Sequence, residues 1–202
     1  MEQPKKYVSF DIESSGPTPG KYSMISIGAC IVGNRNKQFY REIKPISMNF
    51  CIEALKIGAQ GLNCTKNLQI FDEYNPHKDA FDAINVLKKL SQQGEAPAKV
   101  MSEYQDWVLK NTRGFRPVEA AAPIKFDGMF TAYYFDNFNN GQNPFGHSGE
   151  DINSMFRGYK QDINEHTKSL GIKSTLTHNA LEDALIQAER FEKLLTLMKI
   201  QF

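Results

Sequence analysis

The sequence predicts an α/β fold in which a mixed β-sheet opens with a three-stranded antiparallel meander and is flanked by α-helices. Two observations predict this fold. Apolar and β-branched runs alternate with short turn-forming segments over residues 7–45, which is typical of neighbouring strands. Farther along the chain, apolar residues recur every three or four positions, which is typical of helices that pack one face against a core.

The meander is predicted from three runs separated by turn formers. YVSFDIE spans residues 7–13, SMISIGACIV spans 23–32 and QFYREIKP spans 38–45. The first connection, residues 14–20, is rich in Gly, Pro and Ser, and the second, residues 33–37, reads GNRNK. Both compositions favour turns, and short turns leave neighbouring strands antiparallel. The three runs are therefore expected to pair in chain order.

Three helices are predicted in the middle of the chain. A short one is expected at residues 52–57. A second is expected at 76–90, where Asn75 can cap the helix, Pro76 can occupy its first position, and apolar residues follow at threefold spacing. A third is predicted over residues 101–110 from the helical spacing of its apolar side chains.

The C-terminal half predicts a strand followed by helices. Residues 117–126 form a short, Ala-rich apolar run broken by Pro123, and aromatic side chains at helical spacing follow over 130–138. The clearest helix is the last one, because apolar residues keep a period of about 3.6 over residues 181–198. Neither a repeat nor a linker divides the sequence, so residues 1–202 are expected to form a single domain.

The composition argues against several classes of protein. With 24 Lys and Arg against 23 Asp and Glu, the formal net charge is +1, so charge alone does not predict a nucleic-acid partner. No apolar run approaches the roughly 20 residues of a membrane span, so no membrane partner is expected. The three cysteines form no CxxC pair and no Cys/His cluster, which argues against a disulfide framework and fits a cytoplasmic location.

Two carboxylates converge at the end of the first predicted strand. Asp11 and Glu13 are two residues apart, and because strand side chains alternate, both point to one face about 6.5–7 Å apart. Such a pair at a strand end is usually solvated, but Val8 and Phe10 just before it are typical of a buried strand. The pair is therefore either a solvated surface pair or part of a site at the mouth of a buried element.

A second candidate site precedes the C-terminal helix. Asn179 with Glu182 resembles a capping box, which starts the helix at the next residue, Ala180. His178 is then left on the preceding loop, and Asp183 lies in the first helical turn. In these positions Asp183 can hold a metal ion while His178 approaches a reacting water as general base. The alternative is a capping histidine beside a surface acid.

A third acid, Asp127, lies between the Ala-rich run and the aromatic residues, where it is either an N-cap or a site residue. In their order along the chain, the patterns DxE, FD and HxxxxD resemble those of the DEDDh family of 3′-5′ exonucleases, the RNase T and proofreading-subunit group. FDIESSGPTPGKYSMISIGA is similar to that family's first motif, PFGHSGEDINSMFRG to a segment after the second acid, and HNALEDALIQAERF to the third motif.

The resemblance implies an RNase H-like fold, in which parallel strands complete the sheet, and a single exonuclease domain. It implies that two Mg²⁺ or Mn²⁺ ions are held by Asp11, Glu13, Asp127 and Asp183, and that His178 is the catalytic base. In our hypothesis Asp11 bridges the two ions. Glu13 and Asp183 complete one of them, and Asp127 holds the other largely through water. The implied reaction releases nucleoside 5′-monophosphates from the 3′ end of DNA or RNA.

The sequence departs from the family's pattern in places. Pro123 and Gly128 stand where many members carry Asn and Trp, so substrate contacts near Asp127 are expected to differ. Residues 63–97 exceed what a minimal member needs and are expected to form a helical insertion that serves specificity or assembly. A homodimer is consistent with the family, and the sequence does not distinguish DNA from RNA as the substrate.

Ser15 and Gly16 are candidates for binding the terminal nucleotide, because glycine permits close approach and the hydroxyl can donate a hydrogen bond. An ordinary turn is the alternative for this pair. Two other functions stay open for the whole chain. One is a catalytically degenerate exonuclease-fold module that binds nucleic acid or a protein partner without cutting. The other is a zinc hydrolase that uses His178 and Glu182, although the sequence lacks an HExxH motif.

Overall fold

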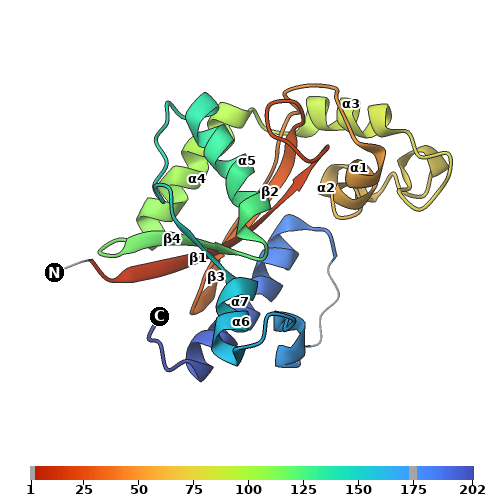
Figure 1. Ribbon diagram of the computed structural model, residues 1–202. Helices are drawn as coiled ribbons and strands as arrows, with labels where there is room; N and C mark the ends of the chain where they lie inside the picture. The colour runs from red at the N-terminus through yellow and green to blue at the C-terminus, as the bar shows by residue number, and fades with distance from the viewer. Residues whose placement is uncertain (1–2, 173–176) are drawn as a thin grey trace.

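The computed structural model describes residues 3–172 and 177–202 (Figure 1). One mixed sheet is built from the strands β1 (Lys5–Ser14), β2 (Met24–Ile31), β3 (Asn34–Glu42), β4 (Arg116–Ala121) and β5 (Gly149–Asp151). Their order is β3-β2-β1-β4-β5. The first three strands pair antiparallel, whereas β4 runs parallel to β1 and β5 runs parallel to β4. The predicted α/β fold, with a meander extended by parallel strands, is confirmed.

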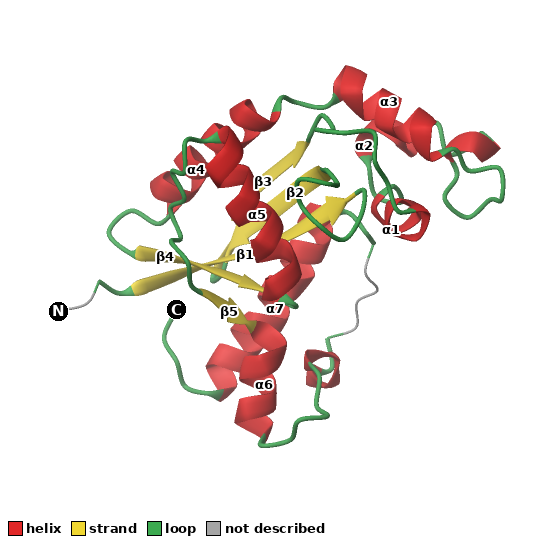
Figure 2. Cartoon of the chain, turned by 45° about the horizontal axis from the view of Figure 1, so that its top comes forward, coloured by secondary structure: helices red, strands yellow, loops and turns green. Residues whose placement is uncertain are grey.

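Helices cover both faces of this sheet (Figure 2). One face packs against α4 (Pro97–Asn111) and α5 (Ile124–Phe138), and the other against α6 (Ile152–Lys160) and α7 (Ala180–Leu197), with the 3₁₀ turn η2 (Thr167–Leu170) ahead of α7. Side-chain alternation in β1 sends Val8 and Phe10 into the first core and Tyr7 into the second, where its ring meets Phe191 of α7 at 5.0 Å. Strand β1 is therefore buried on both faces.

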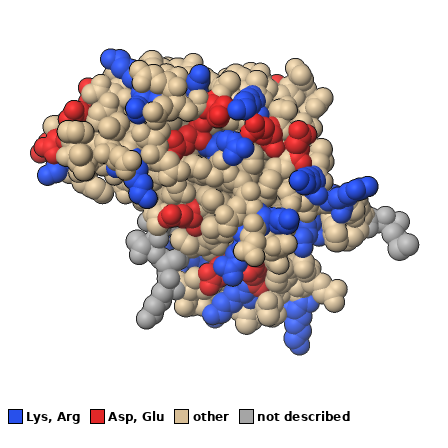
Figure 3. Space-filling view, turned by 180° about the vertical axis from the view of Figure 1, so that it is seen from behind, with Lys and Arg blue, Asp and Glu red and all other residues tan. Residues whose placement is uncertain are grey.

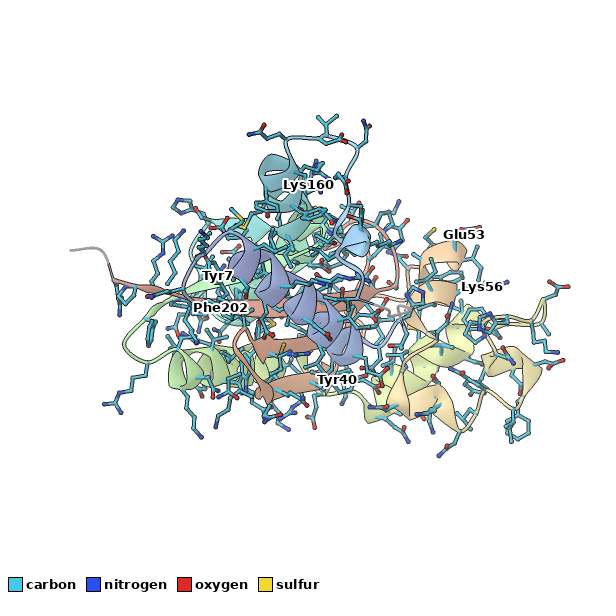
Figure 4. The ribbon with its side chains drawn as sticks, turned by 90° about the horizontal axis from the view of Figure 1, so that it is seen from below. Tyr7, Tyr40, Glu53, Lys56, Lys160 and Phe202 are labelled. Carbon is cyan, nitrogen blue, oxygen red and sulfur yellow. The ribbon has the colours of Figure 1, made fainter. Side chains whose placement is uncertain are left out.

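A helical segment, residues 52–93, projects beside the sheet (Figure 1). It contains α1 (Ile52–Gly58), α2 (Asn63–Lys66), the 3₁₀ turn η1 (Asp72–Tyr74) and α3 (Ala83–Gln93). Its own apolar cluster includes Leu55, Leu62, Phe81, Val86 and Leu87, and Ile25 of β2 joins that cluster to the sheet. In Figure 4 the N-terminal end of α7 is directed toward this segment, which carries the labelled Glu53 and Lys56.

The start of α3 differs from the predicted helix at 76–90. The helix begins at Ala83 rather than behind Asn75, because the Asp82 carboxylate accepts hydrogen bonds from the amides of Ile84 at 2.8 Å and Asn85 at 3.3 Å. A carboxylate that satisfies two amides of the first turn is a strong helix cap. The chain before Asp82 forms turns instead.

The second connection of the meander is shorter than predicted. Strand β3 begins at Asn34, so most of GNRNK belongs to the strand, and the turn is made around Gly33, whose φ is +83°. Glycine enters this left-handed region without a steric cost. The helices predicted at 52–57, 101–110 and 181–198 are confirmed as α1, α4 and α7. No helix within residues 3–172 and 177–202 is long and apolar enough to cross a membrane.

Candidate active site

The two acids at the C-terminal end of β1 open onto one cavity. Pairing with β2 continues past both residues, which keeps Asp11 and Glu13 on the sheet face that α7 covers. They line a cavity of about 290 Å³ whose walls also include Asp127, His178 and Asp183. The structure thus brings together in one cavity the four acids and the histidine that the sequence singled out.

Asp127 reaches the cavity from the first turn of α5. The parallel pairing of β1 with β4 ends before Ile12, and the Ile12 amide donates to Asp127 Oδ1 at 3.2 Å. Asp151 holds the same turn, because its carboxylate accepts from the Ile124 amide at 3.1 Å while it caps α6. Asp127 is 3% exposed, and Pro123, not Asp127, occupies the N-cap position of α5. The N-cap alternative for Asp127 is therefore wrong.

The loop before α7 holds His178 and Asp183 next to Glu13. As predicted, α7 begins behind Asn179, whose side-chain oxygen accepts hydrogen bonds from two amides of the first turn. Asp183 accepts from the amides of Thr177 at 2.9 Å and His178 at 3.0 Å, which ties the loop to the helix. Ligand atoms of Glu13, His178 and Asp183 all lie within 4.8 Å of one another. One cation at this point would have both carboxylates within reach and the imidazole beside it.

The helical segment contacts this loop through a glycine. A Cβ on Gly61 would lie 2.2 Å from the carbonyl oxygen of His178, so no larger residue fits without a shift of the backbone. The side-chain amide of Asn179 donates to the Gly61 carbonyl at 2.8 Å across the same contact. His178 itself has a φ of +55°, a conformation that costs a residue other than glycine on the order of 1–3 kcal/mol. The contacts around it therefore hold a strained loop in place.

Gln187 is a site residue that the sequence analysis missed. Its side-chain amide donates to Asp11 Oδ1 at 2.8 Å, and its side-chain oxygen accepts from the Ala122 amide at 2.7 Å. It thereby fixes one oxygen of Asp11 and connects β1 and α7 with the residue that follows β4. Gln187 follows Asp183 by four positions, so both lie on one helical face. That spacing was the signal available in the sequence.

Burial and mutual repulsion raise the pKa values of the site carboxyls. The pKa of Asp11 lies well above its usual range, first because the side chain is desolvated and then because Asp127, Glu13 and Asp183 are like-charged neighbours. The pKa of Glu13 is raised well above its usual range by burial and then by Asp183. Burial also raises the pKa values of Asp127 and Asp183, against hydrogen bonds from backbone amides that favour ionisation.

This donor set fits divalent cations. Carboxylates that repel one another in a buried cavity are stabilised in the ionised form by positive charge placed between them. The acids that line the cavity offer oxygen donors and no thiolate, which is the chemistry that hard divalent ions prefer. The interpretation of Asp11 and Glu13 as a solvated surface pair is wrong, since Glu13 is 8% exposed and both line the cavity.

The structure does not bring Ser15 and Gly16 into the cavity. The Ser15 hydroxyl donates to the Asn49 carbonyl at 2.8 Å and accepts from the Ser23 amide at 2.9 Å, so it holds the turn after β1 together. Gly16 packs against the ring of Tyr22, where a Cβ would come within 2.4 Å of a ring carbon. Substrate binding by these two residues stays a prediction, and both are occupied by internal contacts.

Glu182 and two other histidines lie away from the acids. Glu182 is exposed and does not line the acidic cavity, so the His178–Glu182 zinc pair is not assembled. His77 and His147 are exposed; the first lies in the helical segment, and the second lines a separate cavity beside α5. Among the described histidines, His178 is the one with a ring nitrogen within 4.8 Å of carboxylate oxygens from two acids, Glu13 and Asp183.

Solved exonucleases share this fold. The nuclease domain of 3′hExo, a DEDDh family member bound to rAMP, matches with a TM-score of 0.69 and 11% identity over 95% of this chain and 92% of that one. An E. coli exonuclease I–ssDNA complex in its zinc-bound form gives 0.62 and 14% identity over 98% of this chain and 42% of that one. Cell-death related nuclease 4 gives 0.62 and 10% identity over 97% and 64%. These likenesses show that the chain has the RNase H-like exonuclease fold.

The sequence itself has a curated relative. It is 34% identical over 192 residues to the 3′-5′ DNA exonuclease Cap18 of Escherichia coli, and the match covers 92% of this chain and 89% of the relative. No family model matches the sequence. The relative is matched over nearly its whole length, and the fold is that of DEDDh exonucleases. The chain therefore belongs to the DEDDh family of 3′-5′ exonucleases.

Proposed function

We propose that this enzyme hydrolyses the terminal phosphodiester bond at the 3′ end of a nucleic acid and releases nucleoside 5′-monophosphates. One observation carries the proposal: four acids and one histidine, which come from β1, α5 and the start of α7, line a single cavity. The name of the curated relative describes a DNA exonuclease, which favours DNA over RNA as the substrate.

In this proposal Asp11, Glu13, Asp127 and Asp183 hold two Mg²⁺ or Mn²⁺ ions. When bound, such ions stabilise the charge that develops on the phosphoryl oxygens and lower the pKa of water. The chain supplies the geometry for this binding. Gln187 fixes one oxygen of Asp11, the Ile12 amide fixes one oxygen of Asp127, and the loop before α7 fixes Asp183.

His178 takes the proton of the attacking water in this proposal. Its backbone is held by Asp183 and by the contact with Gly61, so the imidazole stays beside the two carboxylates of Glu13 and Asp183. A general base in such a position contributes roughly 10²–10⁴-fold to a hydrolysis rate. Through the ions that they would hold, the four acids would place the scissile phosphate near the imidazole.

The chain works as one exonuclease domain in our proposal, and residues 63–97 form a helical insertion within it. The location of Gly61 just ahead of that range, against the His178 loop, supports a role for the segment in shaping the site. A homodimer also stays a prediction, which light scattering on the purified protein tests directly.

A time course on matched oligonucleotides tests the proposed reaction. We expect 3′-labelled single-stranded DNA to lose its terminal nucleotide in Mn²⁺, whereas DNA with a blocked 3′ end stays intact. RNA and duplex ends of the same sequence, run side by side, define the substrate. Intact DNA and RNA in every lane would reject the proposal and favour a degenerate module that only binds.

Two histidine variants test the base. His178→Ala should lower kcat by at least about a hundredfold yet leave Mn²⁺ binding, measured by calorimetry, nearly intact. His147→Ala is the matched control, because His147 is exposed and lines a different cavity. Wild-type turnover in His178→Ala would remove this histidine from the mechanism.

A further inference from the structure

The acidic cavity lies where strands β1 and β4 separate. Their parallel pairing ends at Ser9 of β1 and Ala120 of β4. If the same register continued for two more residues, Asp11 would stand opposite Ala122. Where two strands separate inside a protein, backbone amides lose their acceptors in the neighbouring strand, and buried amides need other acceptors in their place.

Two side chains take the place of the missing strand pairing. The Ile12 amide of β1 donates to Asp127 Oδ1 at 3.2 Å. The Ala122 amide donates to the side-chain oxygen of Gln187 at 2.7 Å, and the side-chain amide of Gln187 donates to Asp11 Oδ1 at 2.8 Å. Gln187 therefore bridges the two positions that the strand register would place opposite each other.

The partners of Gln187 determine the orientation of its side chain. The Ala122 amide can only donate, so the oxygen of the Gln187 side chain faces Ala122 and the nitrogen faces Asp11. Gln187 is 5% exposed, so water competes little for either hydrogen bond. The bridge thus fixes both the position and the rotation of the Asp11 carboxylate.

The segment after β4 is also held by Asp151. The Asp151 carboxylate accepts from the Ile124 amide at 3.1 Å while it caps α6. Ala122 is thus fixed by α7, and Ile124 is fixed by the start of α6. Asp127 lies in the first turn of α5, directly after this segment, so its position relative to Asp11 depends on these hydrogen bonds.

The separation of Asp11 from Asp127 matters for the size of the ions that the cavity can hold. Mg²⁺ demands near-ideal octahedral geometry with oxygens at about 2.0–2.1 Å, whereas Ca²⁺ accepts about six to eight oxygens at about 2.3–2.6 Å in flexible geometry. Groups that orient metal ligands from outside typically change metal affinity by about 10–100-fold. A loosely held pair of acids should therefore lose affinity for Mg²⁺ before it loses affinity for Ca²⁺.

We propose that Gln187 sets the separation of Asp11 from Asp127 and thereby makes the cavity selective for small divalent ions over Ca²⁺. The inference rests on the proposed function, because it assumes that these acids hold divalent ions. Gln187 is a positioning residue in this scheme. It acts through Asp11 and Ala122 and takes no part in proton transfer.

Calorimetric titration of the metal-free protein with Mg²⁺, Mn²⁺ and Ca²⁺ gives the first test. Gln187→Met keeps the length of the side chain and loses both hydrogen bonds. The dissociation constants for Mg²⁺ and Mn²⁺ should rise about 10–100-fold, and that for Ca²⁺ less than about threefold. Gln187→Asn keeps a buried amide that is too short to reach both partners, and it should shift the Mg²⁺-to-Ca²⁺ ratio in the same direction. An unchanged ratio in either variant, once circular dichroism shows it folded, would overturn the inference.

Two variants control for unspecific effects. Gln105 of α4 accepts from the side-chain amide of Asn139 at 2.8 Å on the opposite face of the sheet, so Gln105→Met also removes a glutamine hydrogen bond. On the face of the molecule in Figure 3, Asp and Glu are interspersed with Lys and Arg. Glu103 is a partly exposed acid that pairs with Arg41 at 2.8 Å, and Glu103→Gln controls for ion binding outside the cavity. Neither control should change the three dissociation constants.

Hydrogen exchange in EDTA reports on the bridge without any ion. In Gln187→Met the Ala122 amide loses its acceptor, and the Ile12 amide should also exchange faster, because it lies across the same strand separation. The Arg116 amide donates to the Pro4 carbonyl at 2.8 Å at the other end of the β1–β4 pair and should keep its rate. The same increase at all three amides would mean that Gln187 only stabilises the fold, and the inference would be wrong.

These measurements separate the inference from the proposed reaction, because neither of them requires turnover. If Gln187→Met shifts the Mg²⁺-to-Ca²⁺ ratio but the wild type cuts neither DNA nor RNA, the role of Gln187 stands although the proposed hydrolysis fails. If the wild type cuts DNA and Gln187→Met binds all three ions as the wild type does, the hydrolysis stands and the inference is wrong.

Discussion

Strands β1 and β4 each carry buried carboxylates, but on opposite faces of the sheet. Glu13 of β1 lines the acidic cavity on the face that α7 covers, whereas Glu119 of β4 is paired in register with Val8 and faces Thr131 of α5, outside that cavity. Both side chains are 8% exposed. The Thr131 hydroxyl donates to Glu119 at 3.1 Å, and burial raises the pKa of Glu119 to about 7. The carboxyl groups of Glu13 and Glu119 are thus equally buried but have different electrostatic surroundings.

The two carboxyl groups differ because of the charged groups next to them, and not because one is more deeply buried than the other. An isolated buried carboxyl can take up a proton near neutral pH and remain as a neutral hydrogen-bonding group. Several carboxyls in one cavity repel one another, and a divalent cation relieves that repulsion better than partial protonation does. On this view the acids at the end of β1 form a cation site, and Glu119 is a structural group outside that cavity, although its charge contributes to the raised pKa of Asp127.

The largest expected difference between variants of the acidic cavity and variants of Glu119 is in kcat. Asp11→Asn keeps the shape of the side chain and an acceptor for Gln187, but removes a charge from the acidic cavity. We expect kcat to fall on the order of 10²–10³-fold, as when one group that stabilises transition-state charge is lost. Glu119→Gln should change kcat by less than about threefold. Similar losses in the two variants, measured on the same DNA substrate, would mean that Glu119 belongs to the catalytic site.

The pH dependence of stability should isolate Glu119. Below about pH 4.5 its carboxyl is protonated in both states; as the pH rises toward 7, the unfolded chain ionises first, so the free energy of unfolding falls. A pKa of about 7 against the usual 4.5 corresponds to at most about 3 kcal/mol. Glu119→Gln should lack this loss, which urea unfolding in EDTA at pH 5, 6, 7 and 8 measures. A constant difference between variant and wild type over that range would contradict the raised pKa.

Divalent cations should stabilise the folded protein through the acidic cavity and not through Glu119. At Mn²⁺ concentrations of about one hundred times the dissociation constant, the free energy of unfolding should rise by about 2.7 kcal/mol. Asp11→Asn should lose most of this gain, and Glu119→Gln should keep it. Thermal unfolding in EDTA and in Mn²⁺ gives the comparison, and a full gain in Asp11→Asn would show that the ion binds without that residue.

The smallest expected effect concerns the hydrogen bond that Glu119 receives. Thr131→Val removes the hydroxyl that favours the ionised form of Glu119, so the pKa of Glu119 should rise further. The cost should be about 1 kcal/mol at pH 8 and less at pH 5, where Glu119 is largely protonated. Urea unfolding at the two pH values measures this difference. Exonuclease activity should stay at the wild-type level, which serves as the control.

Much of the site could be predicted because it is encoded in short local patterns. Alternation in a strand placed Asp11 and Glu13 on one face, and a helix cap at Asn179 placed Asp183 in the first turn of α7. The spacing of Gln187 from Asp183 places both on one helical face, but it does not show that Gln187 binds Asp11. That hydrogen bond exists only because α7 meets the end of β1, a contact between segments far apart in the sequence.

The fold was predictable to a similar extent. Hydrophobic periodicity located the strands of the meander and the C-terminal helix, which bury one face or both against the core. The start of α3 was predicted wrongly because Asn75 and Asp82 are both suitable caps. The burial of Phe81 and Ala83 on either side of Asp82 decides between them, and burial is a property of the assembled fold.

The close approach of Gly61 to His178 restricts how this enzyme can be re-engineered. The helical segment looks like a removable module in the ribbon drawing, yet its backbone is one of the supports of the loop that carries the histidine. A chimera that exchanges these helices for those of another exonuclease would therefore alter turnover as well as specificity. Exchanges that retain residues 58–62 keep that support.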